Sequence, residues 1–292
     1  MIKFGTQNMY SELKSVLMKR PQSFMSKVNS NKWNYDFPLD QNLINKNYNE
    51  FKKIIENFGT EIFELKLEDD NMELCDSIFT HDPSIIIDEG AIILNMGKKL
   101  RKPETKAHYN FYKSLDIPII GVLNDDATVE GGDCLWINKK LLLIGKSNRT
   151  NIEGIKQLKE LLKRFDIEIN VIKLPEFSNQ YSCFHLMSAL SILDKDLIIG
   201  YKKYLDSEFF KILNKNKIKF INIPEEDYFK SKTLAVNILT LSPRNLILMR
   251  EFPKTCELLI KEKCNLNLFS GSELCIKAEG GPTCLTRPIF RK

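Results

Sequence analysis

The chain has 292 residues, of which 43% are hydrophobic and 28% charged, a composition typical of a folded globular protein. Its 43 basic and 38 acidic residues give a net charge of +5, and we interpret the scattered lysines as solvated helix faces rather than a nucleic-acid-binding surface. No apolar run could span a bilayer, and the N-terminal sequence lacks the features of a signal peptide. We therefore expect one cytoplasmic domain over residues 1–292; the composition leaves open whether it forms a homo-oligomer.

Seven cysteines and three histidines limit the redox and metal chemistry of the chain. The number of cysteines is odd and no pair has C-x-x-C spacing, which favours free thiols in a reducing compartment. The histidines, at positions 81, 108 and 185, form no H-x-x-x-H or comparable pattern with the cysteines. We therefore expect no metal site.

In chain order, the sequence repeats one pattern: an apolar strand, a basic or polar turn, and an amphipathic helix. After a longer first unit, the pattern recurs at intervals of about 50 residues, the scale of repeat architectures. The predicted strands are Ser15–Met18, Ala91–Asn95, Leu141–Gly145, Asp196–Gly200 and Leu246–Met249. The predicted helices are Leu43–Phe58, Glu104–Leu115, Ile152–Phe165, Ser207–Asn214 and Thr255–Lys263.

The helix predicted at Ile152–Phe165 carries a clear signal, because apolar residues at 152, 155, 158, 161, 162 and 165 share one helical face. Thr150 or Asn151 can cap its N-terminus. Second strands follow the helices of the last four units, at Ile117–Val122, Ile167–Ile172, Ile218–Ile223 and Leu266–Phe269. Five α/β units of this kind favour a closed ring, because closure leaves no sheet edge exposed.

An ionisable or amide residue recurs at the entry to successive units. These residues are Asp82, Glu130 with Asp133, His185, Asn237 and Cys284, and the steps from Asp82 to Cys284 are 48, 55, 52 and 47 residues. If the repeats form a ring, equivalent positions meet near its axis. The last of them, Cys284, follows Gly280-Gly281-Pro282, where glycine allows close backbone approach and positive φ. We expect this bend to present the thiol at a strand edge.

A thiol, an imidazole and carboxylates in one cavity would supply a nucleophile, a proton carrier and groups that bind cations. Carboxylates at Asp82, Glu130 and Asp76 favour a cationic ligand, and a planar guanidinium fits paired carboxylates best. Arg101 and Arg149, each just after a predicted strand, could hold the carboxylate of an amino-acid substrate.

Each residue also has a structural interpretation. Asp82 could start a turn before Pro83, His185 could be a core histidine, and Asn237 a buried amide. Taken singly, Arg101 and Arg149 are each more typical of surface residues. We interpret Lys98, Lys99, Lys146 and His108 as solvated groups, and the cysteines other than Cys284 as small apolar core residues.

From about Ser11 to the C-terminus, the chain resembles the guanidine-modifying (pentein) superfamily, and most of all dimethylarginine dimethylaminohydrolases. The motifs that carry the resemblance are Asp76-Ser77-Ile78-Phe79-Thr80-His81-Asp82, Glu130-Gly131-Gly132-Asp133, Gly145-Lys146-Ser147-Asn148-Arg149-Thr150-Asn151, Phe184-His185-Leu186 and Gly280-Gly281-Pro282-Thr283-Cys284. The resemblance implies an α/β fold with five blades, the five-bladed α/β propeller. It implies no metal and no organic cofactor.

Residue by residue, the resemblance makes Cys284 the nucleophile that attacks the guanidinium carbon. It makes His185 the group that protonates the leaving amine and then activates water, with Glu130 orienting the imidazole. Asp82 and Asp76 would bind guanidinium or amino nitrogens, and Arg101 and Arg149 the α-carboxylate. The implied reaction converts arginine or an N-methylated arginine to citrulline, with release of ammonia or an amine, through a covalent thiouronium intermediate on the cysteine.

Two rival functions stay open: an amidinotransferase, which passes the amidino group to an acceptor amine, and a non-catalytic protein that binds arginine analogues or another protein. Arginine deiminases and amidinotransferases commonly carry an acid two positions after the histidine, where this chain has Met187, which favours the dimethylaminohydrolase type. His81 departs from that type, which carries a glutamate there. The Gly-Gly-Pro-Thr-Cys loop is closer to the deiminase pattern.

Overall fold

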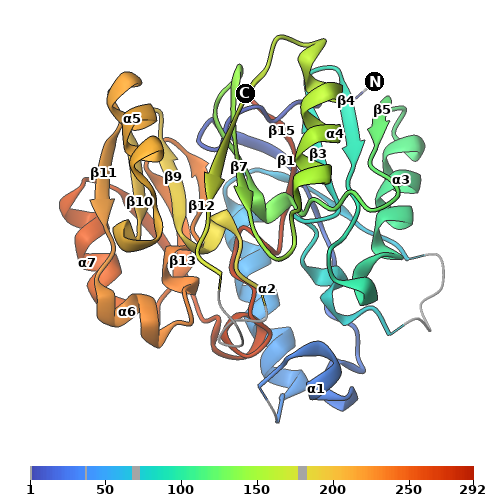
Figure 1. Cartoon of the computed structure of the whole chain (residues 1–292). Helices are drawn as coiled ribbons and strands as arrows, with labels where there is room; N and C mark the ends of the chain where they lie inside the picture. Colours follow the sequence, from blue (N-terminus) through green and yellow to red (C-terminus); the bar gives the residue numbers. More distant parts are fainter. Residues whose placement is uncertain (1, 37, 68–72, 177–182) are drawn as a thin grey trace.

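The computed structural model describes residues 2–36, 38–67, 73–176 and 183–292, which form five three-stranded sheets with helices such as α3, α5 and α7 at the periphery (Figure 1). The strands are β1 (Leu13–Met18), β2 (Glu61–Glu64), β3 (Ser84–Ile87), β4 (Gly90–Ile93), β5 (Ile119–Val122), β6 (Cys134–Asn138), β7 (Leu141–Lys146), β8 (Glu168–Lys173), β9 (Leu190–Asp194), β10 (Leu197–Gly200), β11 (Lys219–Asn222), β12 (Leu239–Ser242), β13 (Asn245–Met249), β14 (Asn265–Phe269) and β15 (Arg287–Arg291). The helices are α1 (Ser30–Trp33), α2 (Gln41–Asn57), α3 (Glu104–Ser114), α4 (Ile152–Lys163), α5 (Ser207–Lys215), α6 (Glu225–Lys230) and α7 (Pro253–Lys261).

Every sheet has the same topology. A middle strand pairs antiparallel with one neighbour and parallel with the other, and a helix connects the two parallel strands. The helical connections are β1–α2–β2, β4–α3–β5, β7–α4–β8, β10–α5–β11 and β13–α7–β14. The antiparallel neighbours are β15, β3, β6, β9 and β12. The first sheet therefore takes its antiparallel strand from the far end of the chain, and the five sheets match the five predicted units.

Helix α4 shows how the sequence sets these elements. The side chain of Asn151 accepts a hydrogen bond from the backbone N–H of Gly154 at 2.8 Å, so Asn151 rather than Thr150 caps the helix. Ile155 and Leu158 are buried against the sheets, as the periodicity predicts. Ile152 differs from the prediction, because in the first turn it is 55% exposed.

Apolar side chains from neighbouring sheets form the core. Residues of β3 and β4 pack with β6 and β7, those of β6 and β7 with β9 and β10, and those of β1 with β12 and β13. A further cluster joins Leu17 and Ile289 of the first sheet to Ile86 of β3. Neighbouring sheets are thereby packed against one another.

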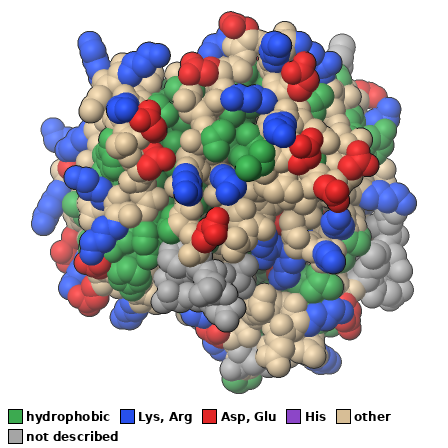
Figure 2. Space-filling view, in the orientation of Figure 1, with side chains coloured by type: hydrophobic (Ala, Val, Ile, Leu, Met, Phe, Trp, Pro, Cys, Tyr) green, Lys and Arg blue, Asp and Glu red, His purple; other side chains and the backbone are tan. Residues whose placement is uncertain are grey.

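The described helices include none that is both long and apolar enough to cross a membrane. On the face shown in Figure 2, basic and acidic side chains are interspersed. This distribution fits the interpretation of the lysines as solvated residues.

Candidate active site

The predicted in-phase residues lie on the loops that lead into the antiparallel strands. Asp82 precedes β3, Glu130 precedes β6, His185 precedes β9, Asn237 precedes β12 and Cys284 precedes β15. Hydrogen bonds connect these loops. The Gly131 N–H donates to the carbonyl of Asp82 at 2.9 Å, and the His81 N–H donates to the carbonyl of Cys284 at 3.2 Å. Residues about 50 positions apart in the sequence thus meet in space.

A small cavity of about 40 Å³ lies where these loops meet. Six of the seven predicted site residues line it, together with Trp33, Lys98 and Cys183; the six are Asp76, Asp82, Arg101, Arg149, His185 and Cys284. The seventh, Glu130, is fully buried behind His185 and bonded to it. Asp133 does not line the cavity; it accepts hydrogen bonds from the Ser147 hydroxyl at 2.6 Å and the Leu186 N–H at 2.8 Å.

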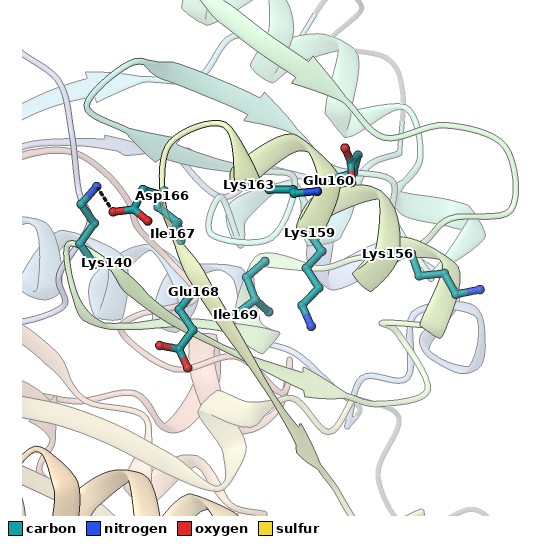
Figure 3. A pocket seen from close by; sticks show the side chains of 9 residues that line it. All are labelled: Lys140, Lys156, Lys159, Glu160, Lys163, Asp166, Ile167, Glu168 and Ile169. Carbon is teal, nitrogen blue, oxygen red and sulfur yellow. Dashed lines mark ion pairs between the residues drawn. The ribbon is translucent and has the colours of Figure 1, made fainter.

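A larger surface hollow, of about 790 Å³, lies elsewhere, between α4 and the start of β8 (Figure 3). Its lining is mostly charged, and the ammonium of Lys140 pairs with Asp166 across 3.4 Å. None of the residues labelled there is a cysteine or a histidine. The smaller cavity therefore holds the groups suited to chemistry.

The thiol of Cys284 is held by an amide. The Asn237 side-chain NH₂ donates to Cys284 Sγ at 3.2 Å, and its carbonyl oxygen accepts from the Thr283 N–H at 2.9 Å. The two glycines before the cysteine allow close packing: a Cβ on Gly280 would lie 2.1 Å from a ring carbon of Phe79. The predicted positive φ is found instead at Glu279, whose φ is 61°.

The imidazole of His185 lies between anionic groups. Its Nε2 donates to Glu130 Oε2 at 2.9 Å, and its Nδ1 lies 3.9 Å from Asp82 Oδ1. The Cys183 sulfur is 3.4 Å from Nδ1, so Cys183 is not the core residue that the sequence predicted. Sequence reasoning missed it because nothing in the spacing distinguishes this cysteine from the buried ones.

These contacts shift the pKa values of the His185–Glu130 pair in opposite directions. Burial alone lowers the pKa of His185, but the Cys183 sulfur, Asp133 and the bond to Glu130 raise it well above 6.5. Burial alone raises the pKa of Glu130, but the bond from His185 and the charge of Arg149 hold it well below 4.5. The pair therefore exists as imidazolium and carboxylate at neutral pH.

The pKa of the Cys284 thiol is raised above the ordinary value of a cysteine. Burial is the largest cause, and the negative charge of Asp82 adds to it, so the pKa of Cys284 rises to about 12. A cation bound beside the sulfur would lower that pKa, because it stabilises the thiolate. A positively charged ligand in the cavity would therefore favour the thiolate, the nucleophilic form of a cysteine.

Arg101 differs most from the sequence-based expectation. Only 4% exposed, it is not a surface residue. Its guanidinium binds both oxygens of Glu104 and donates from Nη1 to Asp82 Oδ2 at 2.6 Å. The i, i+3 spacing of Arg101, in the turn before α3, and Glu104, the first residue of α3, could have suggested this pair. These contacts occupy most of the guanidinium, so few of its donors are left for the α-carboxylate of a substrate.

Arg149, Asp76 and Lys98 also line the cavity. Arg149 is 11% exposed, and its Nη1 lies 3.3 Å from Glu130 Oε1. Asp76 accepts hydrogen bonds from the Tyr35 hydroxyl at 2.7 Å and the Lys98 ammonium at 2.6 Å. Lys98 is therefore not the solvated group that the sequence predicted. His108 is buried too, bonded through Nδ1 to Ser84.

One cluster of possible metal ligands and the seven cysteines remain to be described. Donor atoms of Glu130, Cys183 and His185 lie within 4.8 Å of one another, a set that could hold one metal ion. In this structure, however, Glu130 and His185 bind each other, which suits them to proton transfer. All seven cysteines lie in the described ranges and are unpaired, as expected from their number and spacing.

Comparison with known proteins identifies similar sequences. A family model described as arginine deiminase matches residues 71–208. The uncharacterized protein YkgA of Bacillus subtilis is 25% identical over 282 residues, which cover 97% of this chain and 93% of YkgA. The N(G),N(G)-dimethylarginine dimethylaminohydrolase of Pseudomonas aeruginosa is 25% identical over 211 residues, 72% of this chain and 76% of that enzyme.

Solved structures show the same fold. The P. aeruginosa dimethylaminohydrolase, as a Cys-to-Ser variant complexed with citrulline, superposes with a TM-score of 0.76 at 22% identity, covering 96% of this chain and 100% of that chain. SxtG, an amidinotransferase from Microseira wollei, superposes with a TM-score of 0.81 at 17% identity, covering 99% of this chain and 97% of SxtG. The comparisons thus confirm the resemblance of this chain to the guanidine-modifying (pentein) superfamily, with a dimethylarginine dimethylaminohydrolase and arginine deiminases among the similar sequences and an amidinotransferase among the similar folds.

Proposed function

We propose that the chain is a hydrolase of guanidino compounds that uses Cys284 as its nucleophile and His185 as its acid and base. The observation that carries this proposal is the cavity that both residues line, with His185 bonded to Glu130 at 2.9 Å and the carboxylate of Asp82 beside them. The relatives named as dimethylaminohydrolase and arginine deiminase support the reaction class.

The fold supports the proposal, since packing between neighbouring sheets is consistent with a single five-bladed ring around the cavity. Strand β12 contacts β9 and β1, and β15 contacts β3. The two remaining junctions are bridged by apolar side chains of β3 and β4 with β6 and β7, and of β6 and β7 with β9 and β10. Seven unpaired cysteines fit a reducing cytoplasm.

The first half of the reaction forms a carbon–sulfur bond. A bound guanidinium lowers the pKa of the Cys284 thiol, the proton leaves to solvent, and the thiolate attacks the guanidinium carbon. Protonated His185 gives its proton to the departing nitrogen, and the bond between that nitrogen and the carbon breaks. An amine or ammonia leaves, and a thiouronium remains on the cysteine.

The second half returns the enzyme to its starting state. Neutral His185 takes a proton from a water molecule, and the resulting hydroxide attacks the thiouronium carbon. The carbon–sulfur bond breaks, the hydroxyl proton of the intermediate passes to the departing sulfur, and the thiol is restored while the product carries a ureido group. Glu130 keeps the imidazole oriented and stabilises its charge throughout.

The test is covalent trapping followed by mass spectrometry. Protein quenched during turnover of arginine, an N-methylated arginine or 5-guanidinopentanoate should gain the mass of the substrate less the departing ammonia or amine, and peptide mapping should place this alkylthiouronium adduct on Cys284. An adduct on Cys183, or ureido product formed without any adduct, would rule out the assigned nucleophile.

Replacing Arg149 with alanine should lower kcat/KM for substrates that carry a carboxylate. Arg149 lines the cavity with its Nη1 3.3 Å from Glu130 Oε1, and a hydrogen bond to a charged group contributes about 1.5–3 kcal/mol. We expect kcat/KM for 5-guanidinopentanoate to fall at least about tenfold. Butylguanidine, which lacks the carboxylate, is the control substrate, and an equal loss on both would contradict this role of Arg149.

Replacing Cys183 with alanine should move the pH profile. The sulfur of Cys183 helps to raise the pKa of His185, so its removal lowers that pKa. The imidazolium is needed to protonate the leaving nitrogen, so the alkaline fall in kcat should shift to lower pH. NMR titration of His185 in the same variant should show the lower pKa. Cys256→Ala, on α7, is the control and should leave both measurements unchanged.

A further inference from the structure

The ammonium of Lys98 lies in a nest suited to a cationic amine. Its Nζ donates to Asp76 Oδ2 at 2.6 Å and to the carbonyl of Trp33 at 3.1 Å. The same nitrogen lies 5.1 Å from the centre of the Trp33 ring, within the range of a cation–π contact. A carboxylate, a carbonyl and an aromatic face are what an ammonium group requires, and here a side chain of the protein itself occupies them.

This nest is part of the cavity and is well ordered by its own contacts. The Lys98 side chain is 13% exposed and that of Asp76 is 7% exposed. The Tyr35 hydroxyl fixes the second oxygen of Asp76 at 2.7 Å. The backbone N–H of Lys98 donates to Glu130 Oε1 at 3.1 Å, which ties the lysine to the residue that orients His185. Lys98 is therefore built into the site.

The charges that line the cavity are balanced with Lys98 in place. Four acidic side chains at the cavity face four basic ones: the acids are Asp76, Asp82, Glu279 and the Glu130 that binds His185, and the bases are Lys98, Arg101, Arg149 and His185. Asp76 is paired with Lys98 and Asp82 with Arg101, and Glu279 lies 3.8 Å from Lys232. A ligand with one guanidinium and one carboxylate is neutral overall and preserves this balance. An added α-ammonium would bring a positive charge for which each of these carboxylates already has a partner.

We propose that Lys98 is a specificity-determining residue that fills the position of a substrate ammonium. The substrates would then be guanidino carboxylic acids without an α-amino group, their carboxylate held near Arg149. This inference rests on the proposed hydrolase function and names the substrate class of that site.

The test compares two compounds that differ only in the α-ammonium, arginine and 5-guanidinopentanoate. For the unaltered protein we expect kcat/KM to favour 5-guanidinopentanoate by at least about tenfold, which corresponds to about 1.4 kcal/mol. Lys98→Met releases Asp76 and should shift the ratio of the two values toward arginine by a similar factor. The control is Lys99→Met, because Lys99 is the exposed neighbour of Lys98 and does not line the cavity. It should leave the ratio unchanged.

Calorimetry with the Cys284→Ser protein measures the relative affinity for 5-guanidinopentanoate and arginine in the absence of turnover. Tighter binding of 5-guanidinopentanoate supports the proposal even if Lys98→Met does not fold. Equal or tighter binding of arginine overturns the role of Lys98 but leaves the hydrolase function standing if ureido product forms. Absence of product and of a Cys284 adduct with every guanidino compound overturns the proposed function itself, and with it this inference.

Discussion

Cys284→Ser is expected to lower turnover of guanidino substrates by at least about 10³-fold, because a serine hydroxyl is not ionised by a neighbouring cation as a thiol is. The substitution removes little volume, and the hydrogen bond from the Asn237 amide at 3.2 Å can form equally well to a hydroxyl. Fold and ligand binding should therefore be retained. Initial rates of ureido product formation and calorimetric binding measure the two effects separately.

The matched control for this variant is Cys183→Ser, which alters the other thiol lining the same cavity. It should keep the covalent adduct on Cys284, with a changed pH profile but measurable turnover. If Cys284→Ser retains turnover while Cys183→Ser loses it, Cys183 rather than Cys284 is the nucleophile.

Arg101→Met is expected to destabilise the protein by about 3–5 kcal/mol, because it leaves two buried carboxylates without their counter-charge. Glu104 is 1% exposed and receives hydrogen bonds from Nε and Nη2 of Arg101, and Asp82 receives one from Nη1 at 2.6 Å. The midpoint of thermal unfolding should fall by roughly 6 °C or more. Urea unfolding monitored by circular dichroism gives the free energy directly.

Arg244→Met provides the comparison, since Arg244 also pairs with two acids, Asp194 and Asp196, but is 30% exposed. Its loss should cost less than about 1 kcal/mol. Glu104→Gln combined with Arg101→Met should recover part of the lost stability, because it removes one of the two uncompensated charges. Equal effects of Arg101→Met and Arg244→Met would show that burial of the Arg101 cluster contributes nothing extra.

The sequence was sufficient to predict the five repeating units and the strands and helices that build them. Hydrophobic periodicity located helices such as α4, and apolar runs located strands such as β7, because one buried face determines each of these elements. The regular spacing of Asp82, His185 and Cys284 predicted that they meet, and in the structure they line one cavity. That much follows from repetition alone.

Repetition could not predict which groups the individual charged side chains contact. Lys98 and Lys99 are adjacent and alike in sequence, yet one is held by Asp76 and Trp33 and the other is exposed. Which of them turns inward depends on where the distant α1 segment lies. The contact between Cys183 and His185 likewise depends on a loop conformation that composition does not specify.

The pairing of β1 with β15 has a consequence for biosynthesis. Strand β1 contains Leu13–Met18, whereas its antiparallel partner contains Arg287–Arg291, only a few residues after Cys284. During translation the four sheets assembled from local segments can form as they leave the ribosome, whereas the first sheet must wait for its last strand. The cavity that Cys284 lines can therefore be complete only after this region has been synthesised.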